Sequence, residues 1–148
     1  MAENDFHKTS HINQCKLIEL GKHHHPNGNL TVVENGTIVP FDLRRVFYIY
    51  DVPGGESRGG HSHKELFQLI VAVSGAFEVL VDDGIDRHNY ALNRPYQGLL
   101  VPPGIWSMEH NFSSGSVCLV LASDHYDEAD YVRDYDEFIQ LTSSKRVK

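Results

Sequence analysis

Short apolar runs, each closed by a turn signal, recur along most of the chain. Residues 66–73 form the clearest run, which is rich in β-branched side chains and stops at Ser74 and Gly75, as a buried strand does before a turn. Alternating apolar positions predict another strand at 76–81, followed by a hairpin turn at 82–84. The same reasoning predicts strands at 15–20, 30–34, 44–50, 87–92, 98–104, 105–112 and 116–122.

Only the end of the chain has helical spacing. Tyr131, Tyr135 and Phe138 recur at i, i+4 and i+7, Asp127 can cap the helix, and Glu128 lies in the expected first turn. Many short strands with frequent turn signals predict an all-β fold, a small antiparallel barrel or double-sheet sandwich. We expect the single C-terminal helix to lie outside it.

Composition limits the class of protein. The 148 residues suit a single domain, 1–148, in which residues 1–14 form a loosely held arm. A net charge of −7 argues against a nucleic-acid-binding protein, which needs a basic face. Because no apolar run approaches the length of a membrane helix and the polar N-terminus does not resemble a signal peptide, we expect a cytoplasmic protein without membrane contact.

His61 and His63 are the first candidates for chemistry. On a strand, residues two apart point to the same face, so the two imidazoles are expected to lie side by side. Such a pair can serve as metal ligands or as proton carriers. A buried pair that only bonds its neighbours is the structural alternative.

Two spaced motifs resemble those of the cupins, which are jelly-roll barrels. The first is His61-x-His63 followed by Gln68 and Gly75. In the second, Pro102-x-Gly104 is followed after two residues by Ser107 and after three more by Asn111. The resemblance implies a cupin jelly-roll barrel with a C-terminal helix.

The match is closer to one cupin branch. Residues 45–51, 58–64 and 123–138 are similar to the dTDP-4-keto-6-deoxyglucose 3,4-ketoisomerases, the WxcM-like sugar isomerases, and the likeness extends over about residues 17–140. It implies a metal-free isomerase that interconverts the 4-keto and 3-keto forms of a dTDP-linked 6-deoxyhexose. The product would feed an aminotransferase in the synthesis of deoxyamino sugars for surface polysaccharide. Family members are homodimers that exchange N-terminal strands.

The residue types agree with chemistry that needs no metal or other cofactor. A cupin metal site uses three histidines and a glutamate, whereas this chain has neutral Gln68 and Ser107 at two of those positions, and both are poor ligands for a transition metal. A shift of the keto group needs a proton taken from C3 and one given to C4, through an enediol. We expect His61 to move this proton and His63 to shuttle protons or orient His61.

Other residues are candidates for catalysis or substrate binding. Tyr48 is expected to bond the sugar oxygens or share in proton transfer, with a core position as the alternative, and Arg45 and Arg58 are candidates for the pyrophosphate, with a merely solvated role as the alternative. Trp106 is a candidate for stacking on the base, and Gln68, Ser107 and Asn111 for contacts with the sugar.

The sequence departs from the family at two positions. Ser107 stands where relatives have histidine or arginine, at a position tied to the face of C4 that is protonated, and Asn27 replaces a common arginine. Two other functions therefore stay open. One is a cupin that binds a nucleotide sugar without turnover, and the other is a metal-dependent cupin enzyme.

Overall fold

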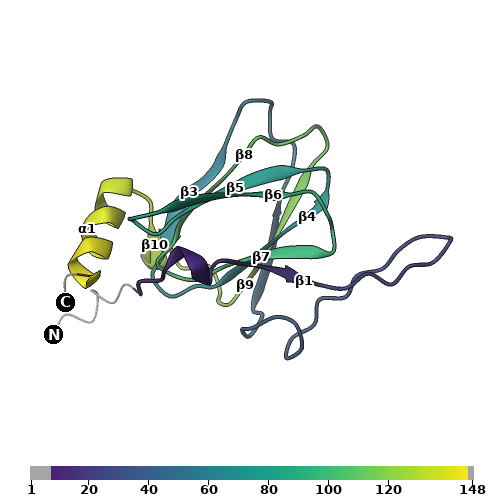
Figure 1. Ribbon diagram of the computed structural model, residues 1–148, viewed down its shortest axis with the longest axis horizontal. Coiled ribbons are helices and arrows are strands. Elements are labelled where there is room, and N and C mark those ends of the chain that lie inside the picture. The colour runs from purple at the N-terminus through teal and green to yellow at the C-terminus, as the bar shows by residue number, and fades with distance from the viewer. Residues whose placement is uncertain (1–7, 147–148) are drawn as a thin grey trace.

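Ten strands, two 3₁₀ turns and one α-helix make up the part of the chain described by the computed structural model, residues 8–146 (Figure 1). In chain order they are η1 (Ile12–Gln14), β1 (Lys16–Glu19), β2 (Arg45–Ile49), β3 (Arg58–His63), β4 (Gln68–Ser74), β5 (Phe77–Asp82), β6 (Arg87–Leu92), β7 (Gln97–Val101), β8 (Trp106–His110), β9 (Val117–Ala122), η2 (Glu128–Asp130), β10 (Tyr131–Val132) and α1 (Tyr135–Arg146).

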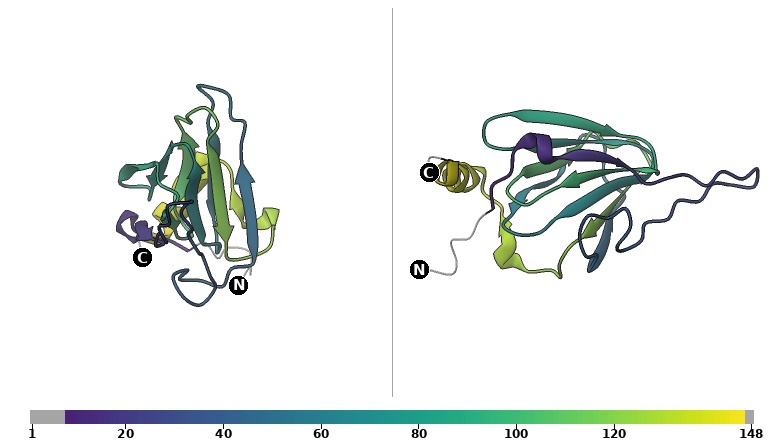
Figure 2. Two further views of the ribbon diagram at one scale, coloured as in Figure 1. Left: turned by 90° about the vertical axis from the view of Figure 1, so that its right-hand side faces the viewer. Right: turned by 60° about the horizontal axis from the view of Figure 1, so that its bottom comes forward.

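The strands form two antiparallel sheets that lie face to face (Figure 2). The first has the order β1-β7-β4-β9-β2 and the second β10-β3-β8-β5-β6, so most neighbours in space are distant in sequence. Helix α1 lies at one end of the sandwich, outside the two sheets (Figure 1). The prediction of an all-β double-sheet fold with an outer C-terminal helix is confirmed.

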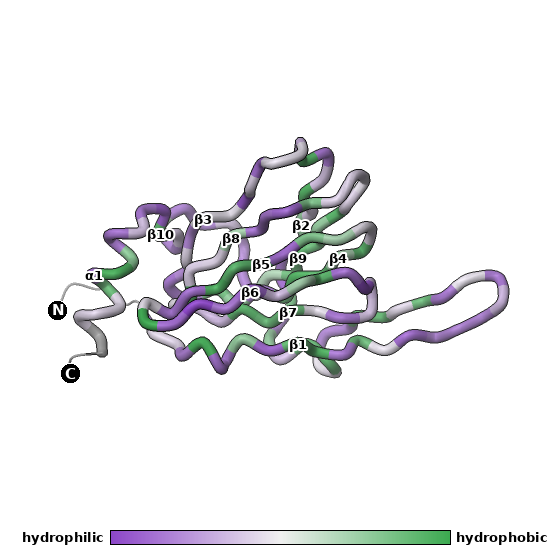
Figure 3. Tube along the Cα trace, turned by 45° about the horizontal axis from the view of Figure 1, so that its top comes forward, coloured by the Kyte–Doolittle hydropathy of each residue, from purple (hydrophilic) through white to green (hydrophobic). Residues whose placement is uncertain are grey.

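The main core lies between the sheets, because alternate side chains of each strand point inward. Ile70 of β4 and Val79 of β5 are completely buried there, together with Val120 of β9. A second apolar cluster, which includes Leu69, Val71 and Val39, covers the opposite face of the first sheet. Figure 3 shows the resulting contrast between hydrophobic β5 and its hydrophilic neighbour β6 at the sheet edge.

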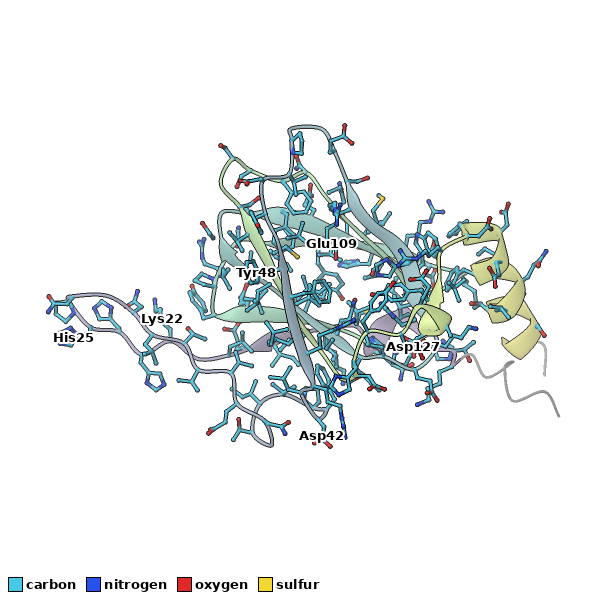
Figure 4. All side chains as sticks on the ribbon, turned by 180° about the vertical axis from the view of Figure 1, so that it is seen from behind. Lys22, His25, Asp42, Tyr48, Glu109 and Asp127 are labelled. Atoms are coloured by element: carbon cyan, nitrogen blue, oxygen red, sulfur yellow. The ribbon has the colours of Figure 1, made fainter. Side chains whose placement is uncertain are left out.

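The strand predicted at residues 30–34 is wrong. Leu30 makes only an isolated bridge to His23, in a loop that projects far from the barrel with His25 near its tip (Figure 4). Residues 31–34 pair with no other strand, and Val33 packs against the second apolar cluster instead. Leu30 and Val32 stay largely exposed, at 58% and 49%, so the apolar content of this segment indicates neither strand pairing nor complete burial.

The helix also begins later than its spacing predicted. Tyr131 and Val132 pair with His63 and Ser62 as β10, and Asp127 caps the short turn η2 instead of α1. Tertiary pairing with β3 outweighs the helical spacing of the aromatic residues. Among residues 8–146, no helix has the length and apolar character needed to cross a membrane. Residues 1–7 of the predicted N-terminal arm lie outside the described part of the chain.

The edges of the two sheets leave a seam that positions the site. Strand β2 ends the first sheet, and β3 with the two-residue β10 ends the second. No ladder joins these edges in the described chain, so side chains from β2, β3 and β10 border an opening into the barrel. The paired histidines lie on β3, at this opening.

Candidate active site

A cavity of about 490 Å³ opens at the seam between β2 and β3. Its volume falls within the roughly 300–1,000 Å³ typical of small-molecule sites. The lining combines an imidazole, two guanidinium groups, an amide and a carboxyl group with apolar side chains. Its residues are Phe47, Tyr48, Ile49, Ser57, Arg58, Gly59, His61, Gln68, Glu109, Tyr131 and Arg133.

The two histidines share one face of β3, as predicted. Their ring centroids are 4.9 Å apart, and the rings meet edge to face. His61 lines the cavity, whereas His63 is only 5% exposed. The ring of Tyr131, brought in by β10, contacts both imidazoles, with centroids 5.0 Å from His61 and 4.4 Å from His63.

His63 is held at both ring nitrogens. Its Nδ1 donates to Oδ2 of Asp130 over 2.9 Å, and its Nε2 accepts from the Gln68 amide over 3.2 Å. Burial raises the pKa of Asp130, but the hydrogen bonds from His63 and the Glu65 amide outweigh it, so the pKa is lowered overall. The carboxylate therefore fixes the tautomer and orientation of His63, which suits an orienting role better than direct proton abstraction.

His61 is a neutral base. Burial, then the neighbouring His63 and the Arg133 guanidinium, lower the pKa of His61 to about 4, although a hydrogen bond with the Gly59 backbone opposes the shift. At neutral pH the imidazole is therefore uncharged and has a lone pair available to accept a proton.

A charged network borders the cavity near His61. Arg133 donates from Nε to Oε1 of Glu128 over 2.6 Å and from Nη2 to Oε2 over 2.9 Å, and Tyr126 also donates to Glu128. The Arg133 guanidinium lies over the Tyr131 ring, 4.2 Å from its centroid. These contacts hold Arg133 in place at the cavity wall, where it can face an anionic ligand.

The two arginines predicted for the pyrophosphate differ in their surroundings. Arg58 is exposed and lines both this cavity and a neighbouring one of about 460 Å³ beside the loop that follows β2. Arg45 stacks over Phe47 and Tyr126, and its Nε and Nη2 atoms are buried without a hydrogen-bond partner in the described structure. Unpaired buried donors are costly, so both nitrogens are suited to an incoming anion.

Ser107 and Tyr48, two further predicted site residues, differ in burial. Ser107 is buried as the cross-strand partner of His61, on the inner face of β8. Tyr48, labelled in Figure 4, borders the cavity, but it is 60% exposed. Its exposed side chain alternates along β2 with those of the partly buried Phe47 and Ile49.

Trp106 and Asn111 are absent from the described lining of the cavity. Trp106 packs against α1, with its ring centroid 5.3 Å from that of Tyr135 and 5.7 Å from that of Phe138. Asn111 donates to Glu78 over 2.6 Å at the far end of β8. Neither contact brings the side chain to the histidines, and their predicted roles stay predictions.

Sequence reasoning assigned no role to Asp130, Tyr131, Arg133 or Glu109. Asp130, Tyr131 and Arg133 lie in the family-like stretch 123–138, which gave no role to single residues, and Glu109 lies two positions after Ser107 and so shares its face of β8. A strand glutamate is normally expected to face solvent.

A metal site has little support in the side chains present. Within residues 8–146, no group of three or more His, Cys, Asp and Glu residues is arranged to hold a metal ion. The Gln68 amide also donates to the Nε2 atom of His63 that a metal would need. Chemistry without a metal stays a prediction.

Comparisons with known proteins agree on one family. A curated TDP-4-oxo-6-deoxy-alpha-D-glucose-3,4-oxoisomerase of Aneurinibacillus thermoaerophilus is 44% identical over 123 residues, which cover 83% of this chain and 88% of that protein. A 3,4-ketoisomerase structure from Helicobacter canadensis is 39% identical with a TM-score of 0.85, covering 87% of this chain and 97% of the other.

A third similarity is to QdtA of Thermoanaerobacterium thermosaccharolyticum, a 3,4-ketoisomerase. The structure of its histidine-to-asparagine variant with TDP-4-keto-6-deoxyglucose is 33% identical, with a TM-score of 0.89, and covers 93% of this chain and all of the other. The family described as FdtA, WxcM-like, C-terminal, matches residues 13–143. With most of its length matched and its site built on the paired histidines of β3, the chain belongs to the FdtA family of WxcM-like proteins.

Proposed function

We propose that this protein is a sugar 3,4-ketoisomerase that interconverts the 4-keto and 3-keto forms of a dTDP-linked 6-deoxyhexose. The observation that carries the proposal is the unequal pair of histidines. His61 is neutral and faces the cavity, whereas His63 is held behind it by Asp130 and Gln68. Similarity to the oxoisomerase of Aneurinibacillus thermoaerophilus supports the same reaction.

His61 moves the carbon-bound proton in this mechanism. The imidazole accepts the proton from C3, which generates an enediol, and returns it to C4 as the carbonyl forms at C3. A well-placed acid–base group of this kind supplies about 10²–10⁴ in rate. Contacts of His63 and Tyr131 with the His61 ring restrict its orientation, so the lone pair stays directed at the sugar.

The side chains at the seam between β2 and β3 suggest where each part of the substrate binds. We place the sugar beside His61, with Gln68 and Ser107 near its hydroxyl groups, and the diphosphate near the arginines of the cavity. Arg58 borders both the inner cavity and its neighbour, so it can contact a ligand that spans the two. Arg45 offers buried donors that lack partners in the described structure. Tyr48 is placed at the rim, and Trp106 and Asn111 are placed outside the sugar pocket.

A homodimer with exchanged N-terminal strands is part of the proposal. Val46 and Tyr48 on edge strand β2, with Tyr50 directly after it, form an exposed apolar row at 52%, 60% and 59% exposure, which suits contact with a second copy. Strand β1 pairs with β7 of the same chain. Because both copies of a homodimer have the same sequence, β1 can pair in the same register with the β7 strand of a partner. Light scattering combined with size-exclusion chromatography tests the expected mass of two chains.

The 3-keto product would serve an aminotransferase in the cytoplasm, during the synthesis of deoxyamino sugars for polysaccharide. The decisive test is incubation with dTDP-4-keto-6-deoxyglucose in heavy water, followed by NMR of the sugar. We expect the 3-keto isomer and deuterium at C3 or C4. Ligand binding without exchange would instead indicate a non-catalytic nucleotide-sugar-binding cupin, and loss of turnover with chelator a metal-dependent enzyme.

A further inference from the structure

Glu109 places a carboxyl group with one unpaired oxygen in the wall of the cavity. The residue is 5% exposed, and its Oε2 atom is buried without a hydrogen-bond partner in the described chain. Among the described residues that line the cavity, Glu109 is the one with a carboxyl side chain. Because an unpaired buried carboxylate is costly, its presence here calls for a function.

The backbone makes room for this group. Glu109 lies opposite Arg58 in the β3–β8 ladder, one position from the Gly59 and Met108 pair. A Cβ atom on Gly59 would overlap the Glu109 carboxylate, and Gly59 adopts a φ of +95° that other residues rarely tolerate. The absence of a side chain at position 59 therefore gives the carboxyl group its space beside the cavity.

The surroundings keep Glu109 protonated to an unusually high pH. Burial raises the pKa of Glu109 to about 7, against a hydrogen bond from its own backbone amide and the charge of Arg58. The titratable groups that share the cavity lining with it are His61 on β3, Arg133, and the phenols of Tyr48 and Tyr131. Cys118 on β9 is also close enough for the charge of Glu109 to raise its pKa, while neighbouring β5 presents apolar Val79. At neutral pH the group is thus able both to donate and to accept a proton.

The isomerisation contains a second proton transfer that His61 does not perform. As the carbonyl moves from C4 to C3, the O3 hydroxyl must lose its proton and O4 must gain one. His63 has both ring nitrogens hydrogen-bonded, and the Glu128 carboxylate is bonded to Arg133 and Tyr126. Glu109 has an oxygen that none of these contacts occupies.

We propose that Glu109 is a second acid–base group of this site, which carries the oxygen-bound proton from O3 to O4. The inference rests on the proposed ketoisomerase function. Glu109 donates its proton to O4 while His61 takes the proton from C3, which breaks the C3–H bond and forms the enediol. The Glu109 carboxylate then accepts the O3 proton as the C3 carbonyl forms, and His61 returns its proton to C4. Both residues end in their starting states, and no other reactant is needed.

The test compares pH profiles of kcat/KM for the wild type, Glu109→Gln and the exposed control Glu34→Gln. The wild type is expected to lose activity above about pH 7, as Glu109 ionises. Glu109→Gln keeps the size and polarity of the side chain but cannot exchange a proton. We expect it to lower kcat by about 10²–10³-fold with little change in KM, and to remove the alkaline limb. Glu34→Gln should match the wild type throughout.

The outcomes separate this inference from the function on which it rests. A wild type without isomerisation or deuterium exchange would overturn the ketoisomerase proposal itself. An active wild type with a wild-type rate or an unchanged alkaline limb in Glu109→Gln would overturn only the role of Glu109. Circular dichroism checks that the variant folds. If it does not, the wild-type profile still decides, because a flat profile between pH 6 and about 9 contradicts a Glu109 relay with a pKa of about 7.

Discussion

Asp130 accepts a hydrogen bond from Nδ1 of His63 over 2.9 Å, across 67 positions of sequence. The same carboxylate accepts from the Glu65 amide over 2.8 Å, so one side chain fixes both a site histidine and the backbone that follows β3. This arrangement makes His63 a rigid support for His61, whose ring packs against it.

Asp130→Asn should lower kcat by about 10–100-fold while KM for the sugar nucleotide changes little. The amide cannot favour the Nδ1 tautomer as a carboxylate does, so the orientation of His63 and of the neighbouring His61 is relaxed. Steady-state kinetics measures the effect, and Asp127→Asn, which alters only the cap of η2, is the matched control. Unchanged kcat in Asp130→Asn would show that His63 needs no fixed orientation.

His61→Asn should abolish catalysis, whereas His63→Asn should also reduce the stability of the fold. Loss of His61 removes the base, so deuterium exchange at C3 and C4 should fall below detection while the fold is retained. Loss of His63 breaks a buried hydrogen bond to Asp130 and should also cost about 1–3 kcal/mol in the free energy of unfolding. NMR exchange and urea unfolding measure the two effects. Retained exchange in folded His61→Asn would refute the role of His61.

Burial of Glu109 predicts a pH dependence of stability. Its pKa is raised from the ordinary value of 4.5 to about 7, so the native state binds this proton more tightly than the unfolded chain. The stabilisation is complete below about pH 4.5 and is lost as the pH rises through about 7, a change of about 3 kcal/mol. Glu109→Gln should therefore gain stability relative to the wild type between pH 5 and 8, as measured by urea unfolding. A difference that stays constant across this range would mean that Glu109 ionises normally.

The strand content and the side-by-side histidines were readable from the sequence because both depend on local alternation. Asp130 and Tyr131 were not, since β10 joins β3 through a long-range pairing, and the spacing of Tyr131 and Tyr135 also fits a helix. The contact of Trp106 with α1 was not readable from the sequence either, because an aromatic strand residue gives no sign of which element will cover it. The docking of α1, which covers it, depends on the tertiary fold.

Gly59→Ala should be more destabilising than Gly115→Ala. Both glycines have positive φ, at +95° and +73°, so both changes introduce backbone strain of about 1 kcal/mol. Only at position 59 would the new methyl group overlap a buried side chain, that of Glu109, whereas nothing lies within 4 Å of the corresponding site at Gly115. We expect an additional cost of about 1–3 kcal/mol for Gly59→Ala. Equal losses in thermal unfolding would show that Glu109 moves aside freely.

Arg45→Met should weaken binding of dTDP by about tenfold without lowering stability. The stem of the side chain keeps its packing against Phe47 and Tyr126, while the two buried nitrogens that lack partners in the described structure are removed. Desolvation of unpaired donors costs free energy in the unliganded protein, and an anion that accepts from them recovers it on binding. Calorimetric titration with dTDP and thermal unfolding measure the two effects, and exposed Arg44→Met on the adjacent position is the control.

Because the Arg45 contact is shielded from solvent, its contribution to dTDP binding should also persist as the salt concentration is raised, unlike that of exposed Arg58. Wild-type affinity in Arg45→Met would assign the diphosphate to Arg58 and Arg133 instead.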